Sequence, residues 1–394
     1  MIQTPFHRRT AALCESHRWK EWAGYHAVSS YDTCHEREYF AFRHATGILD
    51  VSPLYKYDVN GKGAGDFLSY VTTRNIAKVR VGQVVYCCWV DRRGKMLDDG
   101  TVTRLEEDLY RVTSAGPMLH WFRSFTDGFD VEVRDTSRAI AALAVQGPTS
   151  AKLLNAVSDG GVEGLRFFRA TRASLGGCDV TITRTGFTGD LGFEVWIDNC
   201  DALRVWDVLM DEGRSYGAMA AGLDALDVTR VEAGFILAGV EYQNAQHCLA
   251  AMQTSTPYEV GLGWTVHLDR GPFIGHRALR AEKAAGPKWA LVGLEIDWVE
   301  IERAFQSKGL PPNLPTSAWR SSVPLYSFGR QIGYATSGAW SPVLKKNLAL
   351  ATVPSRFAEE GTTVDFEIDV EFWRKNVKAT VVETPFYNPA RKRM

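Results

Sequence analysis

The stretch RTGFTGDLGFEVW, Arg184 to Trp196, joins a glycine-rich turn to a predicted β-strand. Side chains alternate along a strand, so Glu194 and Trp196 should share one face and Phe193 and Val195 the other. A carboxylate offers two acceptor oxygens side by side, which suits a flat heterocycle that presents a ring N–H beside an amino group, as a pterin or a guanine does. We therefore expect Glu194 to bind such a ligand, although a surface glutamate on an edge strand would have the same local sequence.

Around this segment the chain mixes helices and strands, and its last part changes to short strands. Apolar spacing predicts helices over Asp201–Glu212 and Leu223–Ala233, each of which ends at a glycine. After residue 284 the strands follow at a spacing typical of a small barrel. These predicted strands are Ala290–Ile296, Gln331–Thr336, Leu348–Val353, Thr363–Ile368 and Val377–Val382.

Composition excludes several classes of protein. The 394 residues carry a net charge of −1, so no basic field exists to attract nucleic acid or an anionic membrane. The seven cysteines are odd in number and form no C-x-x-C pair, which argues against a disulfide framework and a zinc site. No apolar run reaches the length of a membrane span. We expect a cytoplasmic protein with no metal, no nucleic acid partner and no membrane partner.

Seven motifs in order along nearly the whole chain resemble the aminomethyltransferase family, which comprises the T-protein of glycine cleavage and related tetrahydrofolate-dependent demethylases. The resemblance implies an α+β fold, a three-domain cloverleaf around a central channel that holds tetrahydrofolate. Residues 1–283 would form two interleaved α+β domains, and residues 284–394 a C-terminal β-barrel. The motifs are ILDVSPL (48–54), GKMLDDGTV (94–102), AVQGP (144–148), TGFTGDLGFEV (185–195), GLDALDVTRVEAG (222–234), GLGWTV with FIGHRAL (261–279) and TSGAWSPVLKKNLALATVP (336–354).

The resemblance also assigns roles to individual residues. Glu194 would take the amino edge of the pterin, Phe187 would form a wall of its pocket, and Tyr86 and Asp98 would lie near the reactive folate nitrogens. Asp98 is the predicted catalytic residue, because a buried acid can stabilise a change of charge or move a proton during one-carbon transfer. Its neighbour Asp99 is predicted to be an ordinary turn residue.

An N-terminal aromatic cluster suggests a second part of the site. Trp19, Trp22, Tyr25 and Tyr31 could form a cage for a methylated ammonium or sulfonium group, because aromatic faces attract such cations. Packing inside the first domain is the alternative interpretation. Leu54 and Trp340 are further candidates for the substrate pocket.

The chain departs from the T-protein pattern in three places. It has Leu226 where T-proteins commonly have arginine, Pro53 where they have histidine, and a longer segment at Val240–Pro257. These changes favour an enzyme that transfers a one-carbon group from a small N-, S- or O-methylated substrate to tetrahydrofolate, which is a demethylase.

Two other functions stay open. The alternative is the glycine-cleavage aminomethyltransferase, which acts on an aminomethyl group bound to a lipoylated carrier protein. A non-catalytic folate-binding factor of iron–sulfur assembly ranks lower, because its K-G-C-Y-x-G-Q-E type motif is missing from residues 239–243.

Overall fold

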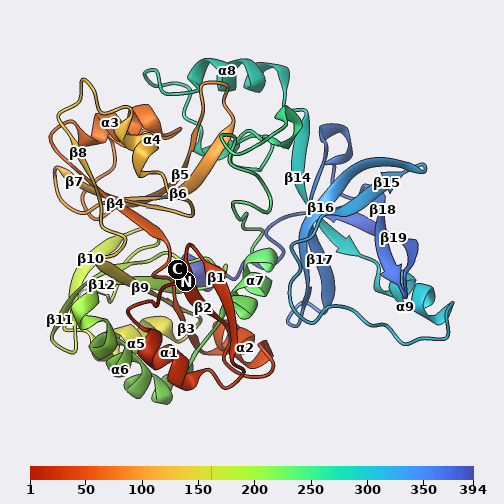
Figure 1. Ribbon diagram of the computed structural model, residues 1–394, viewed down its shortest axis with the longest axis horizontal. Helices are drawn as coiled ribbons and strands as arrows, with labels where there is room; N and C mark the ends of the chain where they lie inside the picture. Colours follow the sequence, from red (N-terminus) through yellow and green to blue (C-terminus); the bar gives the residue numbers. More distant parts are fainter. Residues whose placement is uncertain (161) are drawn as a thin grey trace.

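The computed structural model describes residues 1–160 and 162–394, which form three lobes around a common centre (Figure 1). The first lobe is built on a sheet with strand order β10-β11-β12-β9-β3-β13, beside a β1-β2 hairpin. Its strands are β1 (Arg18–Trp22), β2 (Tyr25–Ser30), β3 (Thr46–Asp50), β9 (Ile140–Gln146), β10 (Ala170–Leu175), β11 (Cys178–Thr183), β12 (Gly192–Asp198) and β13 (Ala218–Ala220). Its helices are α1 (His7–Leu13), α2 (Glu36–His44), α5 (Ser150–Val157), α6 (Ala202–Gly213) and α7 (Leu223–Glu232).

Two apolar layers cover this sheet. Side chains of α5 and α6 pack on one face with Phe193 and Val195 of β12. Residues of α2 and α7 pack on the other face with Trp196. The predicted alternation along β12 is therefore confirmed, and it places Glu194 on the face of α7.

The second lobe is inserted between β3 and β9, so the first two lobes are interleaved in sequence. Its sheet has the order β5-β6-β7-β4-β8. Helices α3 and α4 cover one face of this sheet, where the apolar side chains of alternate strand positions form a separate core. The elements are β4 (Tyr55–Asn60), α3 (Ala64–Val71), β5 (Val84–Val90), β6 (Met96–Arg104), β7 (Leu109–Ser114), α4 (Leu119–Arg123) and β8 (Glu132–Asp135), and α8 (His276–Ala285) follows later in the chain.

The third lobe is a closed barrel with strand order β14-β17-β16-β15-β18-β19. The expected strands are all present, and β15 was missed because its sequence VPLYS is short and contains a proline, which weakens a strand prediction. The lobe comprises β14 (Trp289–Ile296), α9 (Trp298–Gln306), β15 (Val323–Ser327), β16 (Arg330–Ser341), β17 (Lys346–Pro354), β18 (Thr363–Val370) and β19 (Trp373–Val382).

A buried polar network joins the barrel to the first lobe. Glu232 of α7 accepts hydrogen bonds from the Tyr39 hydroxyl (2.5 Å), the Arg43 guanidinium (2.5 Å) and the hydroxyl of Ser341 in β16 (2.5 Å). The chain then returns to the centre, where Arg391 pairs with the buried Asp190. The barrel and the C-terminal segment are thus held to the first lobe by side chains that are far apart in sequence.

Within the described residues, we find no helix that combines the length and the apolar character needed to cross a membrane.

Candidate active site

Glu194 lies in the middle of β12, between β9 and β11. Its partners across the sheet are Ala144 and Thr183. The side chain is partly exposed. Burial raises the pKa of its carboxyl, while hydrogen bonding to the Thr185 and Trp196 side chains and then the Lys56 charge oppose that rise. The carboxylate predicted to bind a heterocycle therefore stands on the inner face of the first lobe, as a partly accessible acceptor.

One face of the second lobe looks toward Glu194. A row of side chains runs across its sheet, in which Lys56 is paired with Thr113, Thr113 with Thr101, and Thr101 with Tyr86. On the same face the Arg111 guanidinium lies 5.3 Å from the centroid of the Trp196 ring. Because Trp196 shares its face of β12 with Glu194, the sheets of the two lobes present these polar side chains to each other.

Asp98 and Asp99 occupy opposite faces of β6. Asp99 is paired with Cys88 and lies on the inner face with Tyr86, whereas Asp98 is paired with Trp89 on the face that α3 and α4 cover. The prediction that Asp99 is a turn residue is wrong, because β6 continues through it to Arg104. The structure brings Asp99, and not Asp98, to the side of Glu194.

The two acids are nevertheless linked by hydrogen bonds. The Tyr86 hydroxyl donates to Asp99 Oδ2 (2.5 Å), and the Tyr242 hydroxyl donates to Asp99 Oδ1 and lies 3.3 Å from Asp98 Oδ1. The Gly116 amide donates to Asp98 Oδ2 (2.7 Å). Burial and the neighbouring charge of Asp99 raise the pKa of Asp98 to about 7, and burial also raises the pKa of Asp99. An acid that titrates near neutrality is suited to proton transfer.

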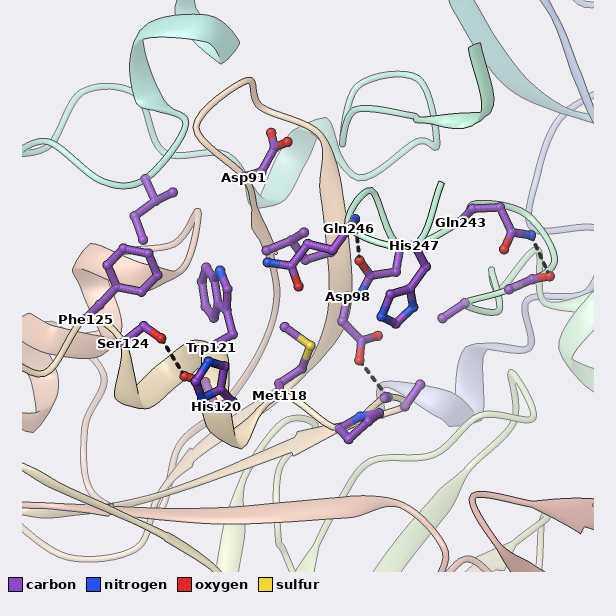
Figure 2. Close-up of a pocket in the computed structure, with 18 of the residues that line it drawn as sticks. Asp91, Asp98, Met118, His120, Trp121, Ser124, Phe125, Gln243, Gln246 and His247 are labelled. Atoms are coloured by element: carbon purple, nitrogen blue, oxygen red, sulfur yellow. Dashed lines mark hydrogen bonds between the residues drawn. The ribbon is translucent and has the colours of Figure 1, made fainter. Parts of the chain in front are cut away.

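A cavity of about 710 Å³ opens on the outer side of β6, and Asp98 is among the side chains that line it (Figure 2). Its walls include the start of β6, the α4 region with Met118 and Trp121, and the longer segment with Gln243 and His247. The turn before β6 and Ile274 also line it. The segment that distinguishes this sequence from the T-protein pattern thus forms one wall of the cavity beside Asp98. Among the described residues, no group of three or more histidine, cysteine, aspartate or glutamate side chains could hold a metal ion.

Aromatic side chains flank the centre. Phe187 stacks on Phe235 with their ring centroids 5.5 Å apart, and the Lys392 ammonium lies 4.7 Å from the Phe235 centroid. Tyr86 stacks on Trp264 at 6.0 Å. These flat apolar surfaces can bind a planar ring, which is the role that the family resemblance implies for Phe187.

The predicted aromatic cage is not gathered in one place. Trp19 and Tyr31 pack against the core on the α5 and α6 side of the first lobe, whereas Trp22 packs against the core on the α7 side, as does Leu54. Tyr25 pairs with Trp22 across the hairpin. Trp340 lies in the barrel, where it packs against Trp298 with ring centroids 5.1 Å apart. The alternative interpretation, packing inside the first domain, accounts for the positions of Trp19, Trp22 and Tyr31.

Sequence reasoning missed Lys56 and Tyr242. Lys56 is 1% exposed, and its ammonium donates to the backbone carbonyls of Ser52 (2.9 Å) and Leu54 (2.8 Å), while burial lowers its pKa to about 8. The alternation in YKYDV was a signal for its inward orientation. No local sequence pattern indicated the contact of Tyr242 with the acids, because Tyr242 lies 144 residues after Asp98 in the chain.

Comparison with known proteins identifies the family. The family model described as GCVT N-terminal domain matches residues 4–270, and the model described as glycine cleavage T-protein C-terminal barrel domain matches residues 310–388. The chain belongs to the aminomethyltransferase family. An aminomethyltransferase of Herpetosiphon aurantiacus is 34% identical with both chains fully covered, and one of Alkaliphilus metalliredigens is 32% identical over 89% of this chain and 88% of its own.

A solved structure agrees with this family. The crystal structure of glycine cleavage system aminomethyltransferase T from Bartonella henselae matches with a TM-score of 0.83 and 25% identity, and 98% of each chain is covered. The predicted α+β cloverleaf with its C-terminal barrel and the predicted transferase class are confirmed.

The prediction of a demethylase is wrong. The relatives that match along nearly the whole chain are named aminomethyltransferases, and so is the solved structure. These findings favour the glycine-cleavage enzyme, which was the alternative. Leu226 and Pro53 were weak evidence, because single substitutions near a site do not decide which donor an enzyme uses.

Proposed function

We propose that this protein is a glycine-cleavage aminomethyltransferase. It transfers the carbon of an aminomethyl group, bound to a lipoylated carrier protein, to tetrahydrofolate and releases ammonia. The observation that carries the proposal is that Glu194 faces the side of β6 on which Tyr86 and Asp99 lie. The chain that holds this arrangement is matched from end to end by an aminomethyltransferase.

The side chains at the centre fit tetrahydrofolate as the acceptor substrate. Glu194 supplies two carboxylate oxygens for the N–H and amino edge of a pterin, and Phe187 supplies a flat surface backed by Phe235. Tetrahydrofolate, when bound, supplies the two nitrogens that take up the carbon. We propose Glu194 and Phe187 as its binding residues and Tyr86 as a residue near the reacting nitrogens.

The acids of β6 handle protons in this proposal. Both folate nitrogens lose a proton when they bond to the transferred carbon, and the departing amine and thiol each gain one. Asp99 faces the centre, and Asp98 is linked to it through Tyr242. We propose that the pair accepts and returns these protons, with Asp98 as the member whose pKa lies near neutrality.

The test is a direct assay. Purified protein is incubated with tetrahydrofolate and an aminomethyl-loaded lipoylated carrier, and the expected result is ammonia and methylenetetrahydrofolate in equal amounts. An unloaded carrier is the control. Binding of tetrahydrofolate without ammonia release from the loaded carrier would contradict the proposed reaction but not the proposed folate site.

A further inference from the structure

Asp98 and Asp99 lie on opposite faces of the sheet of the second lobe. Asp98 lines the 710 Å³ cavity on the outer side, and its hydrogen bond to the Gly116 amide is drawn in Figure 2. Asp99 lies on the inner side, where Tyr86 donates to it. Neighbouring residues of a strand point to opposite faces, and the side chain that contacts both acids comes from another part of the chain.

Tyr242 is that side chain. It follows α7 in the chain, and it is 2% exposed. Its single hydroxyl donates to Asp99 Oδ1 and lies 3.3 Å from Asp98 Oδ1, so one oxygen atom contacts the acids of both faces. Tyr86 donates to Asp99 alone.

We propose that Tyr242 relays protons between Asp98 and Asp99, and thereby between the outer cavity and the inner face of the site. In one transfer the Asp98 carboxyl gives its proton to the Tyr242 oxygen while the Tyr242 hydroxyl proton passes to Asp99. Two O–H bonds break and two form, the tyrosine is neutral before and after, and the net result is one proton moved from Asp98 to Asp99. The reverse transfer follows the same atoms.

The groups around Tyr242 favour proton transfer between Asp98 and Asp99. Burial and then the charge of Asp99 raise the pKa of Tyr242 well above its ordinary value. The hydroxyl therefore stays protonated, and the tyrosine is neutral before and after it passes a proton on. Asp98 lines a cavity whose other walls include the titratable side chains of His120 and His247. The groups that face the relay are Tyr86 and Glu241 on the inner side and Asp91, Arg92, His120 and His247 around the cavity.

The relay rests on the proposed function, in which protons must move between folate nitrogens and leaving groups. Its kinetic test is a double-mutant cycle with Tyr242→Phe and Asp98→Asn. Each single variant should lower kcat by about 10- to 100-fold, and the double variant should be no slower than the slower single. The dependence of kcat on pH near 7 should also disappear in Tyr242→Phe, because Asp98 is then disconnected from the inner face.

Tyr86→Phe is the matched control. It also removes one tyrosine hydroxyl from Asp99 but does not interrupt the path from Asp98, so its effect should multiply with that of Asp98→Asn and the pH dependence near 7 should persist. The relay would be overturned if the decrease in kcat of the double variant equalled the product of the decreases of Tyr242→Phe and Asp98→Asn. An unchanged pH profile of kcat in Tyr242→Phe would also overturn it.

An infrared titration of the protein without substrates separates the relay from the proposed reaction. The carboxyl band of Asp98 is assigned by its loss in Asp98→Asn and is then followed with pH. Tyr242→Phe should shift the titration of both acids to higher pH, whereas Tyr86→Phe should mainly shift that of Asp99. An Asp98 band that is unchanged in Tyr242→Phe would refute the hydrogen-bonded link even if the enzyme acts on another donor.

Discussion

Glu194 and Asp98 lie in different environments, which suit them to different roles. Glu194 is partly exposed on the inner face and is available to a ligand. Asp98 is 2% exposed and is held by the Gly116 amide. A partly accessible acceptor suits binding, whereas a buried acid with a raised pKa suits proton transfer.

Replacement of Glu194 tests the binding task. Glu194→Ala removes two acceptors, each worth about 1.5–3 kcal/mol when a charged group takes part, so the Kd for tetrahydrofolate should rise at least about 100-fold. Glu194→Gln keeps one acceptor and should lose less. Asp98→Asn should bind tetrahydrofolate almost as the wild type does, because Asp98 lies behind the sheet. Equal affinities for the wild type and Glu194→Ala in titration calorimetry would refute this role.

Asp98 should also make stability depend on pH. Its pKa is raised from 3.8 to about 7 on folding, so the unfolded chain ionises first and the wild type loses stability as the pH rises from about 4 to about 7. Asp98→Asn cannot ionise. Its free energy of unfolding relative to the wild type should therefore increase between pH 4 and pH 8, by at most about 4 kcal/mol. Urea unfolding at several pH values measures this difference, and a constant difference would mean that the pKa of Asp98 is not raised.

At the scale of elements, the register of β6 decides which acid lies on which face of the sheet. The pairing of β5 with β6 shifts between Trp89 and Val90, so that Leu97 is an extra residue at the start of β6. A bulge of this kind breaks the alternation that a sequence pattern assumes. Farther along, Gly100 lies where the backbone of β7 approaches closely.

Gly100→Ala should disturb this register. A Cβ at residue 100 would lie 1.8 Å from the carbonyl oxygen of Thr113, so β7 must move. We expect a loss of about 1–3 kcal/mol or more in the free energy of unfolding. Gly271→Ala is the control, because its Cβ would meet no atom within 4 Å, and it should change stability by less than about 0.5 kcal/mol. Equal urea midpoints for the two variants would show that the strands tolerate the added atom.

At the scale of the whole molecule, the last residues of the chain connect the barrel to the first lobe. Figure 1 marks the C-terminus at the first lobe, where the Arg184 guanidinium donates to the Met394 carbonyl oxygen. We propose that the first two lobes and the barrel divide near residue 284. Contacts that cross this division then hold the C-terminal part of the chain against the first lobe.

Arg391→Ala should weaken this contact. The Arg391 guanidinium binds both carboxylate oxygens of the buried Asp190, at 2.7 and 2.8 Å, and accounts for much of the compensation of its charge. Because Arg391 is itself 38% exposed, we expect a loss of about 1–3 kcal/mol in the free energy of unfolding. Arg374→Ala removes a 3.7 Å pair with Glu367 in which the arginine is 78% exposed, and should cost less than about 0.5 kcal/mol. Similar unfolding curves for both variants would argue against a structural role for the C-terminal contact.

The sequence determined the features that repeat locally. The two-residue period of β12 oriented Glu194, the apolar spacing of α6 and α7 located those helices, and the short strands after residue 284 predicted the barrel. The motifs then identified the family. These predictions succeeded because each depends on residues that are neighbours in the chain.

Only the tertiary structure decided the face of Asp99, the contact of Tyr242 with both acids and the separation of the N-terminal aromatic residues into different cores. Each depends on a bulge or on packing between elements far apart in sequence, and a local pattern carries no information about such contacts. The demethylase prediction depended on a few substitutions near the site, which say less about the donor than similarity over nearly the whole chain.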